Sequence, residues 1–407
     1  MSNSFRFKLA AVLGNILEHY DSALFALLAP FIAPLFFNQT DPVTSLLLTY
    51  AILPLGRLVR PVGSLVFGWI GDRWGRKEAL SISLFGMALS TVAIGCLPTA
   101  DQIGMLAPVF LSFGRMCQSF FAAGEASGGA IFVLEQTEQK KRSLMSGFFE
   151  SSTVLGIILA SFLVMAMSHF ETVQVYWRFL FWGGGITALF ALLLRLNGRN
   201  DTHFKPSEKI HLFPLLLTHR VRLLRLVLAS GFSYTTYSLA FTFMAGFFPM
   251  VTDYTASDFM KVNTGLLFLD MLLLPFFGWL ANKIGKEKLM RFATAATSLL
   301  ALPLFFLMGT SAALVVPIMI VVLGVAFSAS YSAWALDEVT EHRYTLISFG
   351  YTVGSQLIGA PATFLCLFLY QSTGWIWAPG LYLAIVSTAA FFALASSKKV
   401  LSNSPTI

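Results

Sequence analysis

The chain has 407 residues, of which 56% are hydrophobic and 12% are charged, and its mean hydropathy is +0.74. No soluble core can bury that much apolar surface, so the composition excludes a soluble globular protein and indicates an integral membrane protein. The formal net charge of +7 does not indicate nucleic-acid binding, because the basic residues lie in short clusters between apolar runs of about 20 residues.

The apolar runs predict twelve membrane-spanning helices, because each run is long enough to cross the hydrocarbon core of a bilayer. The first run contains Glu18 and Asp21 and lacks a small-residue cleavage site, so we expect it to remain as the first span rather than to be a signal peptide. In chain order, the expected spans cover residues 11–37, 45–69, 78–97, 105–134, 143–168, 178–196, 222–251, 262–281, 291–309, 312–336, 345–370 and 378–396.

The chain repeats itself after about half its length. The segment Gly68–Glu78 is hydrophilic and lies between two apolar runs, so a tight turn outside the membrane is expected there. A similar segment, Gly278–Lys288, follows about 210 residues later, which indicates two related halves. We expect an all-α integral membrane protein with twelve transmembrane helices in two pseudo-symmetric six-helix bundles, residues 1–196 and 222–407, joined by a cytoplasmic linker, residues 197–221.

The distribution of Lys and Arg predicts the orientation in the membrane. Outside the helices, nearly all of them lie on one side of the expected spans, and only Arg178 and Lys261 lie on the other. Positive residues favour the cytoplasmic side, so both termini are expected in the cytoplasm. We therefore expect a multi-pass protein of a bacterial inner membrane.

Several classes of enzyme are excluded by the absence of their motifs. No Walker A sequence, dinucleotide fingerprint, zinc-protease motif or serine-nucleophile elbow occurs, so we expect neither an enzyme nor a bound cofactor. Cys96, Cys117 and Cys366 lie in apolar runs without metal-ligand spacing, so no metal site is expected. Two duplicated six-helix bundles suit a transporter that rocks one half against the other around a central cavity. Without a site for ATP hydrolysis, the energy for such transport would come from a gradient.

The loop after the second span has the pattern Gly-x-x-x-Asp-Arg-x-Gly-Arg-Lys and resembles the signature loop of the major facilitator superfamily. The resemblance implies a latch that holds the two halves together on the inner side in the outward-facing state; the alternative is a structural turn with ordinary topology charges. Asp72 of this loop could stabilise the N-terminus of a neighbouring helix through the helix dipole. The basic residues of the loop could pair with Glu135 or Glu138. The residues of the pattern are Gly68, Asp72, Arg73, Gly75, Arg76 and Lys77.

Three stretches of the first half resemble the metabolite:proton symporter branch of that superfamily, which includes importers of proline and betaine, dicarboxylates, citrate and shikimate. Two residues depart from the branch. His19 stands where an aromatic residue is usual, and Arg57 is an additional cation one turn before the familiar arginine. The stretches that carry the resemblance are Gly14–Asp21, Arg60–Gly63, and Gln118 with Gly124, Glu125 and Gly128.

Ionised side chains at the centre of a membrane helix cost about 2.5 to 3.5 kcal/mol each, so every buried charge needs a partner or a task. Three acids and three arginines of the first half are expected to lie inside the membrane, at comparable depths except for a deeper Arg115. Glu18 and Asp21 are three residues apart, which places both on one face of the first span. Arg57 and Arg60 have the same spacing and share one face of the second span. The six residues are Glu18, Asp21, Glu125, Arg57, Arg60 and Arg115.

These charges have two interpretations. They are either fixed ion pairs that lock helices together, or groups for proton coupling and substrate binding. A carboxylate in a low-dielectric cavity holds its proton more firmly and a nearby arginine loosens that hold, so alternating access could switch the carboxylate between the two conditions. We expect Glu125 or Asp21 to carry the proton and Arg60 to pair with Glu18. The residues expected to contact the substrate are Arg57, Arg60, Arg115, Gln118, Tyr234, Tyr237 and Gln356.

Three further features of the sequence concern His19, Asp270 and the run Tyr234–Tyr237. His19 is either part of a proton relay with Glu18, Asp21 and Glu125 or packs where the family has an aromatic ring. Asp270, the only internal acid expected in the second half, either serves the cavity or pairs with Lys261 or a polar neighbour. The run Tyr234–Tyr237 is expected to line a cavity, because four adjacent hydrogen-bonding side chains would be wasted against lipid.

We therefore predict a secondary active transporter that imports a small polar, carboxylated metabolite or compatible solute by proton-coupled symport and alternating access. The expected partners are the small-molecule solute, a proton and the lipid bilayer, and a monomer is expected. One alternative is a proton-coupled exporter or exchanger of a drug-like or siderophore-like compound, because efflux uses similar buried acids. Another is a non-transporting sensor, which the short linker and tail disfavour.

Overall fold

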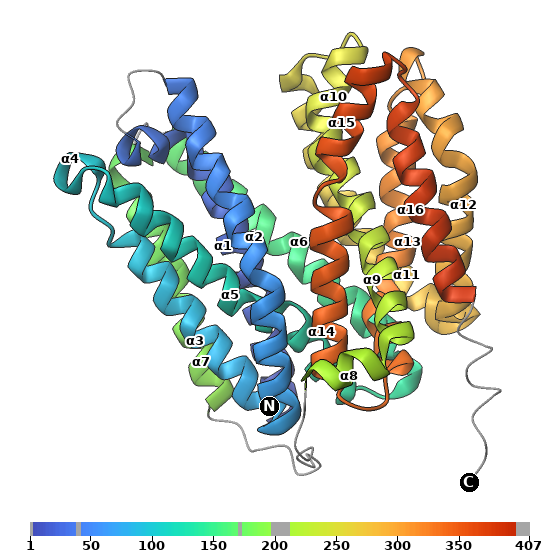
Figure 1. Ribbon diagram of the computed structural model, residues 1–407, viewed down its shortest axis with the longest axis horizontal. Coiled ribbons are helices and arrows are strands. Elements are labelled where there is room, and N and C mark those ends of the chain that lie inside the picture. The colour runs from blue at the N-terminus through green and yellow to red at the C-terminus, as the bar shows by residue number, and fades with distance from the viewer. Residues whose placement is uncertain (1–2, 38–41, 170–172, 197–211, 396–407) are drawn as a thin grey trace. The chain divides into compact units, whose positions relative to one another are not determined.

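The computed structural model describes residues 3–37, 42–169, 173–196 and 212–395. Within these ranges the chain is helical and contains no β-strand (Figure 1). The all-α architecture predicted from the hydropathy pattern is therefore confirmed for the part of the chain that the structure describes.

In the first half of the chain, each expected span corresponds to one long helix. The long helices are α1 (Asn3–Phe36), α2 (Pro42–Arg73), α3 (Arg76–Gly95), α5 (Leu106–Glu135), α6 (Arg142–His169) and α7 (Val173–Leu196). Two short elements lie between them, α4 (Ala100–Ile103) and the 3-10 turn η1 (Gln139–Lys141).

In the second half, two of the expected spans are interrupted by π-helical segments. Expected span seven consists of α9 (Arg220–Tyr237), the π-segment η2 (Ser238–Phe243) and α10 (Met244–Val251). Expected span eleven consists of α14 (Arg343–Gly354), the π-segment η4 (Ser355–Gly359) and α15 (Ala362–Thr373). The other elements are α8 (Leu212–Thr218), α11 (Ala256–Ile284), α12 (Lys286–Phe306), the 3-10 turn η3 (Leu307–Gly309), α13 (Val315–Glu338) and α16 (Ala378–Ala395).

Nine helical stretches of the described chain are long and apolar enough to cross a membrane. Three further stretches, α2, α5 and the run from α9 to α10, coincide with the remaining expected spans. Each of these three has charged or polar side chains well inside it: two arginines in α2, Arg115 and Glu125 in α5, and the run Tyr234–Ser238 at the junction of α9 and η2. Charged side chains are costly inside a membrane, so each is a candidate for pairing or for a function.

The chain folds into two compact units. Unit 1 contains the described residues of Met1–Gln136, Ser152–Ile210 and His342–Phe349; unit 2 contains those of Thr137–Ser151, His211–Glu341 and Gly350–Ile407. The start of α6 thus packs with unit 2, and the start of α14 packs with unit 1. Of the predicted linker, residues 197–211 lie outside the described residues, and α8 and the start of α9 occupy the rest.

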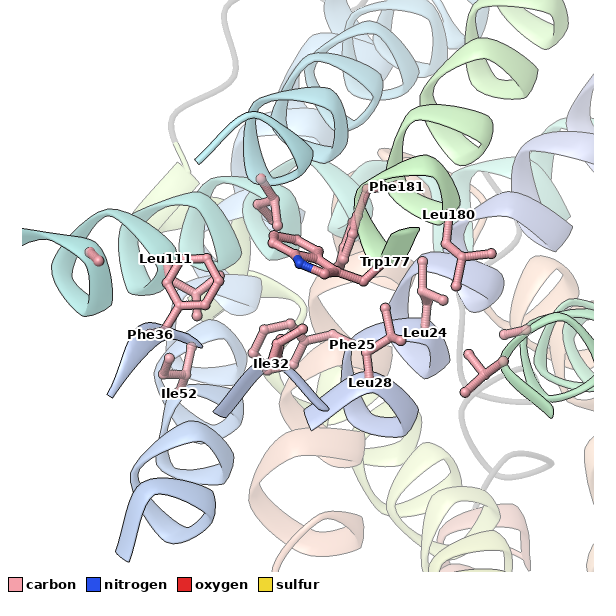
Figure 2. Close-up of a cluster of buried hydrophobic side chains, with 14 of the residues drawn as sticks. Leu24, Phe25, Leu28, Ile32, Phe36, Ile52, Leu111, Trp177, Leu180 and Phe181 are labelled. Atoms are coloured by element: carbon pink, nitrogen blue, oxygen red, sulfur yellow. The ribbon is translucent and has the colours of Figure 1, made fainter. Parts of the chain in front are cut away.

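An apolar core fills the part of unit 1 that follows the acidic residues of α1 (Figure 2). Leu24, Leu28, Ile32 and Phe36 recur at helical spacing on α1, and Trp177 from α7 packs edge-on against Phe36 at 5.7 Å between ring centroids. Side chains from α2 and α5, including Ile52 and Leu111, complete the cluster. Burying a large apolar side chain stabilises a fold by about 1.5 to 3 kcal/mol relative to exposure to water.

The turn predicted at Gly68–Glu78 is much shorter than expected. Helix α2 continues to Arg73 and α3 begins at Arg76, so only Trp74 and Gly75 lie outside the helices. Gly75 has φ 126° and ψ 155°, a backbone conformation that only glycine adopts without strain. Its counterpart in the repeat, Gly285, separates α11 from α12 with φ 96°. The two copies therefore share their backbone geometry as well as their sequence.

Both π-segments of unit 2 have a carbonyl that accepts a hydrogen bond from a side chain of a neighbouring helix. In η2, the Phe241 carbonyl accepts from Asn263 Nδ2 of α11 at 3.3 Å. In η4, the Ile358 carbonyl accepts from the Tyr382 hydroxyl of α16 at 2.6 Å. A π-segment leaves helical carbonyls without their usual partner, so these side chains satisfy groups that would otherwise be costly in a membrane.

Gly75→Ala is expected to destabilise the protein by about 1 to 3 kcal/mol, because alanine is strained at this positive φ. The matched control is Gly246→Ala in α10, where an added Cβ meets no atom within 4 Å and the change should be neutral or slightly stabilising. Thermal unfolding of both purified variants in detergent measures the difference. Equal melting temperatures for the two variants would contradict the proposed constraint at Gly75.

Candidate functional site

Four polar side chains of unit 1 form a chain of hydrogen bonds from α5 to α1. Arg115 donates to Gln118 Oε1, Gln118 Nε2 donates to Thr91 Oγ1 at 2.7 Å, and Thr91 donates to Asp21 Oδ2 at 2.6 Å. Arg115 Nη1 also reaches the Asp21 carbonyl oxygen at 3.5 Å, and its guanidinium lies 4.4 Å from the centroid of the Phe25 ring. We call these four residues, Asp21, Thr91, Arg115 and Gln118, the Asp21 cluster.

The direction of donation in the Asp21 cluster follows from the chemistry of its members. Arginine has no acceptor, so it can only donate, and the carbonyl oxygen of the Gln118 amide must face it. The Gln118 amino group then faces Thr91, whose hydroxyl accepts and has its own proton left for Asp21. Asp21 is 2% exposed, and its other oxygen, Oδ1, has no hydrogen-bond partner among the described residues. A buried acceptor without a partner is costly, and Glu18 Oε2 is in the same state.

Glu18 lies one turn before Asp21 on α1 and pairs with Arg60 of α2. This pairing was predicted from the sequence and is confirmed. Glu18 is 1% exposed, whereas the Arg60 side chain is 22% exposed. Arg60 also lies close enough to Arg115 for their charges to repel.

His19 lies at the edge of these charges. Its Nδ1 is 2.9 Å from the Asn15 carbonyl oxygen and 3.7 Å from Glu18 Oε2. A carbonyl oxygen only accepts hydrogen bonds, so Nδ1 carries a proton and Nε2 of the neutral ring is the atom that can accept one. Both interpretations of His19, relay and packing, remain compatible with this position.

Glu125 is held by a residue that sequence reasoning missed. Arg195 of α7 donates to both Glu125 oxygens, at 2.7 and 3.2 Å, and also to the carbonyl oxygens of Leu80 at 2.7 Å and Ala10 at 3.1 Å. Both side chains of the pair are 1% exposed. The pair is thus a neutral, fully hydrogen-bonded lock between α5 and α7.

This arrangement differs from the interpretation in which the three acids and three arginines of the first half, Arg115 deeper than the others, neutralise one another, because the partner of Glu125 is a fourth arginine. Glu125 lies against Gly14, one turn before Glu18 on α1. Arg57 is exposed and makes no ion pair with the described residues. Arg195 had been counted among the basic residues outside the membrane because it stands at the end of its span. The apolar residues on both sides of it, Leu192–Leu194 and Leu196, were the signal that it is buried.

The predicted substrate residues of the second half all lie in unit 2. The rings of Tyr234 and Tyr237 on α9 are 6.3 Å apart, and Gln356 of η4 donates to Ser355 Oγ at 3.3 Å. Thr235 and Thr236 are buried and donate to carbonyl oxygens of their own helix, so neither hydroxyl requires a cavity. Within unit 1 the structure therefore brings Asp21, Arg115 and Gln118 together, with Glu18 and Arg60 nearby.

A second acid was also missed in unit 2. Glu150 lies on α6 and accepts a hydrogen bond from Ser332 Oγ of α13 at 3.0 Å. Glu150 comes from the first half of the chain, so the expectation for Asp270 in the second half is not affected, and the two carboxylates are close enough to interact electrostatically. The pairing of Asp270 with Lys261 that the sequence left open does not occur, because Lys261 pairs with Asp258 at 3.0 Å.

Asp72 of the signature loop binds the first turn of α14, which belongs to unit 1. Its carboxylate accepts from the backbone N–H groups of Tyr344 at 3.2 Å and Thr345 at 2.9 Å, and from the Thr345 hydroxyl at 2.7 Å. A carboxylate at a helix N-terminus satisfies free N–H groups and the helix dipole together. Arg76 joins Asp72 at 2.7 Å to Glu135 at 3.3 Å, as expected from the sequence.

The other residues of the signature loop allow this close contact. Gly68 packs against the Thr345 backbone and Gly71 against the Tyr344 ring, where a Cβ would collide. Arg73 lies 5.0 Å from the Trp69 ring centroid, and Lys77 Nζ is 3.4 Å from the Leu196 carbonyl oxygen.

The repeat reproduces this arrangement inside unit 2 with a neutral acceptor. Asn282 Oδ1 accepts from the Ser143 N–H, in the first turn of α6, at 3.2 Å. Lys286 pairs with Asp337, as Arg76 pairs with Glu135 in the first copy. The second copy thus has one neutral hydrogen bond where the first has three bonds to a charged carboxylate.

No group of three or more His, Cys, Asp or Glu side chains that could hold a metal ion occurs among the described residues. The polar clusters consist of arginines, carboxylates, amides and hydroxyls. Such sets can bind organic anions and exchange protons.

Comparisons with known proteins give one family and one fold. The sequence profile of the Major Facilitator Superfamily matches residues 11–362. The chain is 29% identical over 402 residues to a putative proline/betaine transporter of Staphylococcus haemolyticus, covering 95% of this chain and 86% of the relative. It is 25% identical over 407 residues to the glycine betaine/proline/ectoine/pipecolic acid transporter OusA of Dickeya dadantii, covering 93% and 80%.

Solved structures show the same fold at low sequence identity. The proton:xylose symporter XylE, bound to 6-bromo-6-deoxy-D-glucose, matches with a TM-score of 0.74 and 13% identity, over 98% of this chain and 96% of that chain. A fucose:proton symporter of Escherichia coli matches with a TM-score of 0.72 and 12% identity, over 100% of both chains.

Replacing Arg195 with leucine should destabilise the protein by about 3 to 5 kcal/mol, because Glu125 is left buried without a counter-charge. The double variant Arg195→Leu/Glu125→Leu should recover much of that loss, since both charges are removed. Thermal unfolding in detergent of the single and double variants measures this, with the exposed Arg57→Leu as control. A double variant less stable than Arg195→Leu alone would contradict the lock.

Asp72→Ala should lower the melting temperature more than Asn282→Ala, because it removes a charged acceptor of three hydrogen bonds rather than a neutral acceptor of one. The expected loss is about 1 to 2 kcal/mol at Asp72 and less than about 1 kcal/mol at Asn282. Both variants are compared by thermal unfolding at low and high salt. An equal loss at both positions would refute the different contributions of the two copies.

Proposed function

Because the chain belongs to the major facilitator superfamily, whose profile matches residues 11–362, we propose that it imports a small carboxylated solute together with a proton. Family membership and the relatives make it a membrane transporter of a solute and not an enzyme. The observation that carries the finer proposal is the Asp21 cluster, which joins a buried arginine to a buried carboxylate with one unsatisfied oxygen.

The choice of a carboxylated solute rests on the arginines and on the relatives. A guanidinium matches the geometry of a carboxylate and binds it with two parallel hydrogen bonds. Arg60, with its partly exposed side chain, is the arginine that an incoming solute meets first, and Arg115 lies beyond it. The names of the relatives include proline, betaine, ectoine and pipecolic acid, and each of these compounds has a carboxylate.

The choice of a proton follows from charge balance around Asp21. Glu18 and Asp21 supply two negative charges, and Arg60 and Arg115 supply two positive charges. An anionic group added to this neutral set is an excess charge in a medium where charges are costly, unless a proton arrives with it. We assign that proton to Asp21 Oδ1 rather than to Glu125, because Arg195 already neutralises Glu125.

We assign the contact of Asp72 with α14 to the conformational latch, together with Gly68, Arg73, Gly75, Arg76 and Lys77. In this contact the Asp72 carboxylate accepts hydrogen bonds from two adjacent backbone N–H groups, and such groups are free only at the start of a helix. Both hydrogen bonds are therefore formed or broken together when the start of α14 moves. We further place the protein as a monomer in the bacterial inner membrane, with both termini cytoplasmic and with six-helix halves at residues 1–196 and 222–407. The excess of basic residues on one side of the spans supports this orientation.

Asp21→Asn should abolish accumulation against a gradient while leaving counterflow largely intact, because asparagine still accepts from Thr91 but cannot bind or release a proton. An imposed gradient of about two pH units supplies about 2.7 kcal/mol per proton, which supports about 100-fold accumulation. We expect the ratio of the solute concentration inside to that outside to fall to one in Asp21→Asn. Uptake of labelled proline, glycine betaine, ectoine and pipecolate into proteoliposomes, with an imposed proton gradient, measures it.

The matched control is Asp101→Asn, an exposed acid of unit 1, which should transport normally. Accumulation by Asp21→Asn equal to that of the wild type would refute proton coupling at this residue. Outward movement of the solute under an inward proton gradient would instead favour the exporter alternative.

A further inference from the structure

The side chain of Tyr344, in the first turn of α14, is completely buried within unit 1. Its hydroxyl donates to the Gly124 carbonyl oxygen of α5 at 2.8 Å. A buried hydroxyl needs such an acceptor, because a polar group that loses water without gaining a partner is costly. This contact is separate from the hydrogen bond that the Tyr344 backbone N–H donates to Asp72.

Two glycines make room for the tyrosine ring. A Cβ on Gly71 of α2 would collide with the Tyr344 ring, and a Cβ on Gly128 of α5 would collide with its hydroxyl. In an α-helix the Gly124 carbonyl oxygen also accepts from the N–H of Gly128, so its second lone pair is the one that binds Tyr344. The missing side chain at Gly128 leaves this lone pair accessible. We call Gly71, Gly128 and the Gly124 carbonyl the tyrosine socket.

Charged residues fix both sides of the tyrosine socket. On one side, the Arg76 guanidinium lies 5.7 Å from the Tyr344 ring centroid and is held by its pair with Asp72 at 2.7 Å. On the α5 side, Glu125 follows the socket carbonyl in the sequence and is held through both oxygens by Arg195. The walls of the socket are therefore held by contacts that do not depend on the Tyr344 side chain.

The second copy of the repeat has no such socket. Gly68 and its counterpart Gly278 both lie directly against the helix start that they meet, so a close helix approach is common to the two copies. The ring and the residues that make room for it are replaced together. When the two copies are aligned, Tyr344 corresponds to Arg142, Gly71 to Ala281 and Gly128 to Ser330. Gly71 and Gly128 therefore serve the tyrosine ring rather than helix packing in general.

The ring also determines which turn of α14 meets Asp72. A carboxylate binds the free N–H groups of any helix start that reaches it. The ring and hydroxyl of Tyr344 fit only where glycines and an accessible carbonyl oxygen lie at the right depth. The side chain therefore fixes the register in which the start of α14 binds unit 1.

We propose that Tyr344 is a positioning residue of the conformational latch. Its ring seats the start of α14 in the tyrosine socket, which brings the N–H groups of Tyr344 and Thr345 to Asp72. The ring leaves the socket each time the latch opens during transport. This inference rests on the proposed function, which assigns the contact of Asp72 with α14 to the latch.

The test measures hydrogen–deuterium exchange of the backbone N–H groups of residues 342–349 in the full-length purified protein. The N–H groups of Tyr344 and Thr345 exchange only when they leave Asp72, so their rate reports how often this contact opens. The variants are Tyr344→Phe, Gly128→Ala, Tyr344→Ala and the double variant Gly128→Ala/Tyr344→Ala. Gly183→Ala in α7 is the matched control, because an added Cβ there meets no atom within 4 Å.

Tyr344→Phe should raise the hydrogen-exchange rate about 5-fold, because it keeps the ring and loses one hydrogen bond. Gly128→Ala should raise the rate about 30-fold, since the new methyl group excludes the hydroxyl from the socket. In the Tyr344→Ala background, the same Gly128→Ala change should alter the rate less than about twofold, because no ring remains to be excluded. Gly183→Ala should exchange as the wild type does.

Three results would overturn the role of the socket. If Gly128→Ala raises the hydrogen-exchange rate equally with and without the Tyr344 ring, Gly128 serves the packing of α5 and not the ring. If Tyr344→Phe and Gly128→Ala both leave the rate unchanged, the side chain does not hold the start of α14. If Tyr344→Phe raises the rate throughout α5 as well, the hydroxyl supports packing in general.

The link to transport is tested with the wild type in proteoliposomes. Proline or glycine betaine present on both sides should raise the hydrogen-exchange rate of residues 342–349 at least about threefold, because each transport cycle opens the latch. Residues 178–190 of α7 should keep their rate. Counterflow of the labelled solute is measured in the same vesicles.

The two measurements separate the inference from the proposed function. If the solute is transported and the hydrogen-exchange rate of residues 342–349 does not change, the ring stays in its socket during transport, and the inference is wrong while the proposed function stands. If neither solute is transported, the proposed function fails for these solutes and the role of Tyr344 in their transport fails with it. The variants then decide separately whether Tyr344 seats the start of α14.

Discussion

A charge inside a membrane has to be neutralised, and this constraint explains the positions of the charged side chains of unit 1. The Glu125–Arg195 pair is the limiting case, because both oxygens of the acid are occupied and the arginine also reaches two backbone carbonyls. Each oxygen of Glu125 already accepts a hydrogen bond from its counter-charge, so the pair fits a structural lock. Asp21 and Glu18 each have one oxygen without a hydrogen-bond partner, but Glu18 pairs with Arg60, whereas Asp21 makes no ion pair with the described residues and is the better candidate for chemistry.

These charged groups contact helix α1 at successive positions along its length. From its N-terminal part onward it meets the Glu125–Arg195 pair at Ala10 and Gly14, then presents Glu18 to Arg60, then Asp21 to its cluster. The residues that follow are apolar and pack into the core of Figure 2. The polar strip of α1 therefore ends at this apolar core, and the Phe25 ring, 4.4 Å from the Arg115 guanidinium, lies at the boundary. Unit 2 also contains a buried ion pair, Arg225 with Glu338 at 2.6 Å, and its other described polar groups include hydroxyls, tyrosines, Asn263 and the acids Glu150 and Asp270.

The internal repeat shows how duplication and divergence combine. Gly75 and Gly285 have the same unusual backbone, and each allows one helix to end and the next to begin within two or three residues. The residues that bind the start of another helix have diverged between the two copies. Asp72 binds the start of α14 with a full negative charge, and Asn282 binds the start of α6 with a neutral amide. One copy thus holds its partner helix more tightly than the other. The π-segments of span seven and span eleven are a further difference, because the corresponding helices of the first half are regular.

The sequence by itself determined the membrane class, the order of the helices, the repeated turn and the Glu18–Arg60 pair. These properties follow from hydropathy, charge and glycine placement, which act locally along the chain and can be read residue by residue. Only the tertiary structure decided that Glu125 pairs with Arg195, that Glu150 stands beside Asp270, and that Asp21 has an unsatisfied oxygen. Those properties depend on which faces of distant helices meet, and residues 70 or 120 positions apart have no local signal of their contact. A basic residue at the end of a span looks the same in the sequence whether it reaches the lipid surface or turns inward, and helix packing alone makes that choice.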